Sequence, residues 1–224
     1  MARIIGVKHT HYNEPLCSLT HFVGALLSVA GLTLLVVFAS LDSTARHVIG
    51  FSIFGASFIV QYLASTFYHI APKPSRIRDI FKRIDHSMVY VVIAATYTPV
   101  CLVLPQMTWG VTLLGVVWLL AVAGIVLKAI GVGIDDWRVT LALYMGLSWL
   151  GVIAFPAFAR SLPHNGMLWL VAGGALYASG ALFYALNHFV PRTRWFGMHE
   201  VFHVFVLAGS FSHFWLMLKY VLYV

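Results

Sequence analysis

Residues 19–41 read LTHFVGALLSVAGLTLLVVFASL and contain no Asp, Glu, Lys or Arg. A membrane-spanning helix needs about 20 consecutive, predominantly apolar residues, and this stretch is long enough to supply them. Only an α-helix or a closed barrel satisfies its own backbone hydrogen bonds inside hydrocarbon. Barrel strands would alternate apolar and polar residues over about ten positions, whereas this stretch is apolar on every side. It therefore predicts a transmembrane helix.

The composition of the whole chain points to the same environment. Of the 224 residues, 61% are hydrophobic and only 9% are charged, whereas a soluble domain carries about 25% charged residues. The formal charge is +7, but the basic residues gather in the breaks between apolar runs. A nucleic-acid-binding protein would spread them over a water-facing surface. The composition thus excludes an ordinary soluble domain and argues against a nucleic-acid partner.

Apolar runs of similar length recur along the chain, separated by polar connectors too short to hold a second domain. We therefore expect one domain over residues 1–224, an all-α bundle of seven transmembrane helices. The predicted spans are Leu19–Leu41, Val48–His69, Ile84–Leu104, Thr108–Leu127, Val139–Phe158, Met167–Leu186 and His199–Leu218.

The distribution of Lys and Arg between the connectors predicts the orientation in the membrane. With a cytosolic N-terminus, the outer connectors carry three basic residues and the inner ones carry eleven: Arg3, Lys8, Lys73, Arg76, Arg78, Lys82, Arg83, Lys128, Arg138, Arg192 and Arg194. This asymmetry predicts a cytosolic N-terminus and an external C-terminus. No cleavable signal sequence is visible, so the first span is expected to serve as the insertion signal.

Ionisable side chains inside spans are costly and suggest function. His199 and His203 are four residues apart, on one helix face, and Ser65 and His69 are spaced likewise at the end of the second span. Asp85 opens the third span. Taken singly, these groups also fit interhelical hydrogen bonds or a helix cap. The predicted topology, however, brings three segments to one depth, and three imidazoles with one open position are typical of catalytic zinc.

The segments that carry these groups resemble a known family. They are STFYH (Ser65–His69), DHSMVYVVIAATYTP (Asp85–Pro99) and HEVFHVFVLAGSFSHF (His199–Phe214). They are similar to the bacterial hemolysin III-like proteins, which belong with the progestin and adipoQ receptors and, more distantly, the alkaline ceramidases. The resemblance implies a seven-helix protein of the bacterial inner membrane with zinc bound by His69, His199 and His203. It also implies that Asp85 lies beside the zinc centre, with Ser65 close by.

Two features stand outside this pattern. Around the start of the first span Glu14 and His21 fit the family, but Asn13 stands where relatives have a first Glu and Cys17 where they have Asn. The roles of Glu14 and His21 therefore stay open. His213 lies ten residues beyond His203, about 15 Å along a helix, which is too far to share an ion. We interpret it as a buried hydrogen-bonding group.

The resemblance, together with these residues, favours a zinc-dependent hydrolase of membrane lipids, acting on an amide bond and taking part in membrane-lipid homeostasis. Asp85 would act as general base and Ser65 would orient water or stabilise the oxyanion. The alternatives are a lipid-responsive sensor with a structural zinc, a pore-forming protein and a bis-histidine haem protein. No path of charges crosses the predicted bilayer, which argues against transport.

Overall fold

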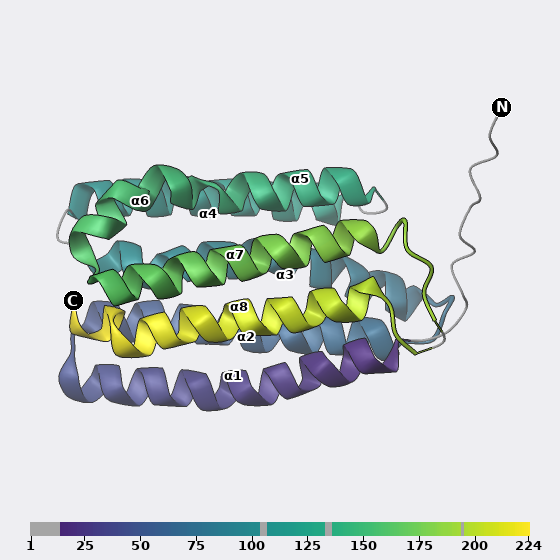
Figure 1. The fold of residues 1–224 in the computed structure, drawn as a ribbon, viewed down its shortest axis with the longest axis horizontal. Helices are drawn as coiled ribbons and strands as arrows, with labels where there is room; N and C mark the ends of the chain where they lie inside the picture. The colour runs from purple at the N-terminus through teal and green to yellow at the C-terminus, as the bar shows by residue number, and fades with distance from the viewer. Residues whose placement is uncertain (1–13, 104–106, 133–135, 194) are drawn as a thin grey trace.

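The structure is a computed structural model that describes residues 14–103, 107–132, 136–193 and 195–224. Within these ranges it is wholly helical (Figure 1). Its helices are α1 (Pro15–Asp42), α2 (Ala45–Ile70), α3 (Arg76–Val103), α4 (Met107–Ala129), α5 (Trp137–Ser148), α6 (Leu150–Ser161), α7 (His164–Leu186), α8 (Met198–Lys219) and the short 3-10 turn η1 (Val221–Tyr223). In the described part of the chain, seven helical stretches are long and apolar enough to cross a membrane, with α5 and α6 together forming one. The predicted all-α, seven-span fold is confirmed.

Helix ends differ from the predicted spans where charged residues continue a helix. α3 begins at Arg76 and not at Ile84, and α4 continues through Lys128. Lys128 is buried and donates to the Thr140 hydroxyl over 2.6 Å, so it is not the loop residue that we expected. Hydropathy marks where lipid ends, whereas a helix ends only where its backbone bonding stops. Of the predicted positions, Arg3, Lys8, Asn13, Leu104 and Arg194 lie outside the described residues.

The fifth span, predicted as one helix, is interrupted at Trp149 between α5 and α6. The interruption leaves backbone carbonyls without their usual helical donors, which is costly in an apolar setting unless another group supplies the bond. The Tyr97 hydroxyl, on α3, donates to the carbonyl of Ser148 over 2.7 Å. A donor from a neighbouring helix thus stabilises the break, and periodicity within the span could not have revealed it.

Consecutive long helices run antiparallel, so the start of α1, the end of α2 and the start of α8 share one end of the bundle (Figure 1). α1 packs on α2, α2 on α3, α3 on α4 and α7 on α8, while α5 and α6 touch their neighbours over few residues. Small residues permit the closest approaches. At Gly55, for example, an added Cβ would lie 2.7 Å from the Leu32 side chain.

The distribution of polarity is the reverse of that in a soluble protein. Leu41, Leu119 and Ile153 are each more than 70% exposed, while several charged and polar side chains are buried. The buried group includes Gln61, His69, Asp85, Glu200 and His203. An apolar exterior is favourable only against lipid. The protein is therefore a multi-pass membrane protein whose polar groups gather inside the bundle.

Candidate metal centre

Three histidine rings meet where α2 ends and α8 begins. The ring centroids lie 5.1 Å apart for His69 and His199, 4.8 Å for His69 and His203, and 4.9 Å for His199 and His203. His69 closes α2, and the other two rings share one face of α8 because they are four residues apart. The structure thus brings together the three histidines predicted as ligands.

A cysteine that we had not predicted as a ligand, Cys17, lies beside two of these histidines. Ligand atoms of Cys17, His69 and His199 all lie within 4.8 Å of one another, so these residues form a candidate metal-binding group. Cys17 is fully buried near the start of α1 and is a free thiol. Imidazole nitrogens and a thiolate are donors that zinc prefers. The donor set therefore fits a zinc ion, and the group contains two of the three predicted histidines together with Cys17.

His203 differs from its two neighbours in what surrounds its ring. Its Nδ1 lies 3.4 Å from the Thr20 hydroxyl, and its ring stacks on His21 at a centroid distance of 3.6 Å. His21 is itself buried on α1. Two side chains of α1, Thr20 and His21, therefore contact the His203 ring. The assignment of His203 as a ligand stays a prediction.

Glu14 orients His69. The Nδ1 of His69 lies 2.7 Å from the Glu14 carboxylate, and because a carboxylate only accepts, this nitrogen carries the proton and donates. Nε2 is then left with the lone pair that a metal ion requires. The Glu14 amide also donates to the His69 carbonyl over 3.3 Å. Metal-bound histidines commonly donate their second ring N–H to a carboxylate in this way, so the geometry answers the open question about Glu14.

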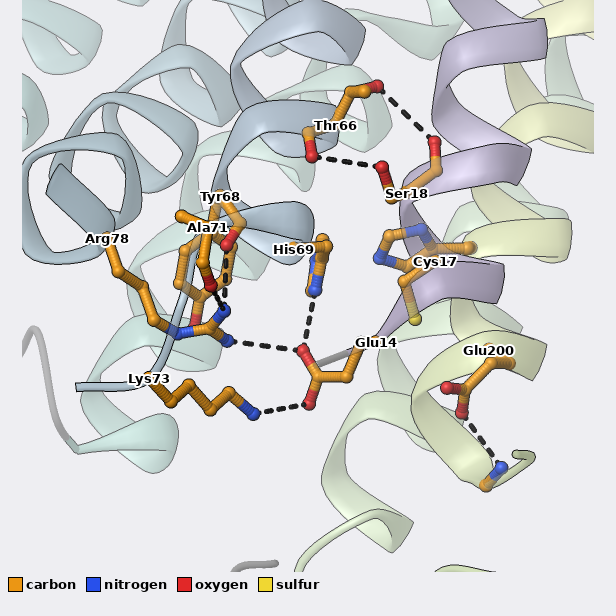
Figure 2. A network of polar contacts seen from close by, with 12 residues as sticks. Glu14, Cys17, Ser18, Thr66, Tyr68, His69, Ala71, Lys73, Arg78 and Glu200 are labelled. Carbon is orange, nitrogen blue, oxygen red and sulfur yellow. Dashed lines mark hydrogen bonds and ion pairs between the residues drawn. The ribbon is translucent and has the colours of Figure 1, made fainter. Parts of the chain in front are cut away.

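Three cationic side chains, those of Lys73, Arg78 and Arg192, surround the Glu14 carboxylate. Figure 2 shows His69, Lys73 and Arg78 pointing to Glu14, and Arg192 lies 2.9 Å from its Oε1. Burial by itself would raise the pKa of the Glu14 carboxyl, but the hydrogen bond from His69 and the charge interactions with His69, His199 and Lys73 hold it well below its usual range. Glu14 is thus held as a carboxylate. Lys73 and Arg78, two of the basic residues from which we predicted the orientation, therefore also contact the site.

Arg192 also connects this network to α8, because it lies 2.5 Å from Glu200. The second Glu200 oxygen accepts the Gly197 amide over 2.8 Å at the start of α8, which satisfies a backbone donor there. Glu200 stands between the two predicted α8 ligands in the sequence. The start of α8 and the start of α1 are thus held together by one arginine.

Asp85 faces the cluster from α3. Its Oδ1 accepts a hydrogen bond from the Gln61 amide over 2.8 Å, and its carboxyl interacts with the Ser65 hydroxyl and the His69 ring. All of these groups are buried. Gln61 and Ser65 of α2 therefore face Asp85, and the predicted base and its serine neighbour are brought together.

A cavity of about 1050 Å³ extends from this site into the bundle. Around the cluster its wall is polar and includes Ser65, His69, Asp85, His199 and His203; farther along it is formed mainly by apolar and aromatic side chains such as Val100, Trp149, Phe155 and Phe158. The lining comes from α2, α3, α5, α6, α7 and α8. One continuous cavity therefore joins the histidine cluster and Asp85 to an apolar, lipid-like region of the bundle.

The fold and this site define a seven-helix membrane protein with a candidate metal centre inside one end of the bundle. The family described as Haemolysin-III related matches residues 9–214, so the chain belongs to the haemolysin III family. The resemblance deduced from the three sequence segments is confirmed.

Individual relatives support the same conclusion. Hemolysin-3 of Bacillus cereus is 37% identical over 205 residues, covering 92% of this chain and 90% of its own. The Hemolysin-3 homolog of Bacillus subtilis is 38% identical over 203 residues, covering 91% of this chain and 92% of its own. The human Monocyte to macrophage differentiation factor is 25% identical over 183 residues, covering 75% of this chain and 68% of its own. No solved structure matches the chain significantly.

Proposed function

We propose that this protein is a zinc-dependent hydrolase of lipid amides in a bacterial inner membrane, working at the cytosolic leaflet in membrane-lipid homeostasis. The observation that carries the proposal is the position of Asp85. It is a buried carboxylate, held by Gln61, in the wall of the cavity that the histidine cluster also lines. A buried carboxylate without a catalytic or structural role would be costly to keep.

The ion would be held by His69, His199 and His203, with Cys17 within reach. When bound, zinc supplies Lewis acidity that polarises a carbonyl and makes water easier to deprotonate. The remaining work belongs to the chain. Glu14 keeps His69 in the tautomer that leaves Nε2 unprotonated, and the Arg192 bridge between Glu14 and Glu200 holds α1 and α8 in register.

Asp85 has the environment of a general base. Gln61 already donates to its Oδ1, so Oδ2 is left to accept a proton as a water oxygen bonds to the amide carbon. The Ser65 hydroxyl, which interacts with the Asp85 carboxylate before the reaction, turns to donate to the oxygen that gains negative charge once Asp85 has taken up the proton. When the C–N bond breaks, Asp85 returns the proton to the leaving nitrogen. The products are a fatty acid and a free amine.

The cavity supports a lipid substrate. Its volume of about 1050 Å³ lies just above the roughly 300–1,000 Å³ usual for small-molecule sites. Its apolar part suits an acyl chain, and α5 and α6, which touch their neighbours over few residues, form one wall. An acyl chain would enter from the bilayer past these two helices while the amide lies beside Asp85.

Cys17 favours a second candidate. Three histidines and a thiolate would close a zinc site with four protein ligands, and closed sites are structural. The protein would then be a lipid-responsive sensor in which zinc joins α1, α2 and α8. Turnover distinguishes the two candidates.

The experiment uses purified protein in lipid nanodiscs, with metal content measured by mass spectrometry. Fatty-acid release from a panel of ceramides and other N-acyl lipids is followed as purified, after chelation and after zinc is returned. We expect about one zinc per chain, with release lost on chelation and restored by zinc. Protein that carries its metal but releases no fatty acid from the panel would exclude the hydrolase and leave the sensor.

The proposed orientation has its own test. An alkaline phosphatase domain fused after Val224 is active only outside the cytosol, so we expect an active fusion. An inactive fusion of a normally expressed protein would show that the bundle has the opposite orientation and that the site lies at the outer leaflet.

A further inference from the structure

A second polar cluster lies deeper in the same cavity. It consists of Tyr62 on α2, Tyr177 on α7, and Ser210 and His213 on α8. The Tyr62 and Tyr177 hydroxyls lie 2.5 Å and 2.8 Å from the Ser210 oxygen. Tyr62, Tyr177 and His213 all line the cavity. None of these residues takes part in the proposed hydrolysis.

The donor hydrogen atoms of this cluster all take part in hydrogen bonds within the protein. Ser210 donates its one proton to the Val206 carbonyl over 2.8 Å, so the two tyrosine hydroxyls donate to the Ser210 oxygen, which has two lone pairs. His213 Nε2 lies 3.4 Å from the Leu170 carbonyl, which only accepts, so Nε2 carries the ring proton. The donors of the cluster are thus directed at protein acceptors.

The groups left over are acceptors. His213 is 6% exposed, and its Nδ1 has no hydrogen-bond partner among the described residues. Both tyrosine oxygens keep a lone pair. Burying an acceptor without a donor is unfavourable. A ligand that completes this cluster must therefore bring a hydrogen-bond donor, and in the midst of an apolar bundle a neutral hydroxyl is the donor that costs least to desolvate.

Space for such a ligand exists beside α7. The His213 ring packs directly on Gly173, where an added Cβ would lie 2.3 Å from its Cδ2 and Nε2. Nδ1 occupies the other edge of the ring. The cavity that Tyr62, Tyr177 and His213 line supplies the space for a ligand at this level.

The depth of the cluster indicates where the hydroxyl must lie. His213 is ten residues beyond His203 on α8, which corresponds to about 15 Å along the helix. We infer that this cluster is a binding site for a mid-chain hydroxyl group, so that the cavity selects hydroxylated acyl chains. The inference rests on the acyl chain lying in the cavity, as in the proposed function, and does not depend on hydrolysis.

The test compares binding of three acids to the Asp85→Asn protein, in which hydrolysis is not expected to interfere. The probes are 12-hydroxyoctadecanoic acid, 2-hydroxyoctadecanoic acid and octadecanoic acid, each displacing a fluorescent fatty acid. One net hydrogen bond corresponds to about tenfold in affinity. We expect the mid-chain hydroxy acid to bind about tenfold more tightly than the other two, which should bind alike.

Substitutions at His213 test whether this residue causes the preference for the mid-chain hydroxy acid. His213→Leu removes the acceptor and should abolish the preference while octadecanoic acid still binds; His213→Gln keeps a neutral acceptor and should retain part of it. Equal binding of the three acids to protein with native His213, binding of none of them, or a preference unchanged in His213→Leu would each overturn the inference. A mid-chain preference without any fatty-acid release from N-acyl lipids would refute the hydrolase alone.

Discussion

The two ends of the cavity are built in opposite ways. At the metal end, α1, α2 and α8 are joined by charged hydrogen bonds, with Glu14 contacting residues of three other segments. Along α5 and α6 the wall is apolar, interrupted at Trp149 and in contact with few neighbours. Placing a metal ion and a base requires fixed side chains, whereas admitting a lipid requires a wall that can yield. The comparison predicts that substitutions at the metal end change chemistry and those at α5–α6 change packing.

The largest effect is expected from His203→Ala. If His203 is a ligand, its loss leaves an under-coordinated site, so the protein should lose most of its zinc on dialysis against a mild chelator and release no detectable fatty acid. His164→Ala, at an exposed histidine where α7 begins, is the control and should keep both properties. Full zinc retention by His203→Ala would remove His203 from the ligand set and favour Cys17 in its stead.

Asp85→Asn should have the next largest effect. The substitution preserves shape but removes the base, so fatty-acid release should fall by about 10²–10⁴-fold while the zinc content is unchanged. Asp79→Asn removes an exposed carboxylate on the same helix and should leave the rate unaltered. Loss of zinc together with activity would make Asp85 a metal ligand.

Glu14→Gln tests the tie between α1 and His69. An amide in place of the carboxylate weakens the acceptor for His69 Nδ1–H, and loss of such a partner typically lowers metal affinity about 10–100-fold. The measurement is competition with a zinc-binding dye. Asp42→Asn, at the other end of α1, is the matched control. An unchanged affinity would mean that Glu14 only joins helices.

The smallest effect belongs to the α5–α6 wall. Tyr97→Phe removes the donor to the Ser148 carbonyl, and we expect about 1 kcal/mol of lost stability with zinc affinity intact. Tyr223→Phe, at an exposed tyrosine, should change stability by less than about 0.5 kcal/mol. Thermal unfolding in detergent and the dye competition measure the two quantities. Weaker zinc binding in Tyr97→Phe would show that the two ends of the cavity are coupled.

The sequence predicted more of the site than of its surroundings. Ser65, His69, His199 and His203 were singled out because polar groups recur at helical spacing in otherwise apolar segments, and Asp85 because it opens an apolar span; their roles came from the family resemblance. Cys17 carried no such signal, since a single cysteine just before the predicted first span looks like any small buried residue. The role of Glu14 was also hidden, because its partners come from the 70–83 segment and the start of α8.

By itself, the sequence determined seven apolar helices and the depth of their polar residues, because both follow from the cost of exposing polar groups to hydrocarbon. It did not determine which side chains of different helices touch. The break at Trp149 stabilised by Tyr97, the Glu14 network and the acceptor cluster around His213 all depend on contacts between residues far apart in the chain. Only helix packing decides such contacts, since it depends on side-chain shape at each crossing and not on hydropathy.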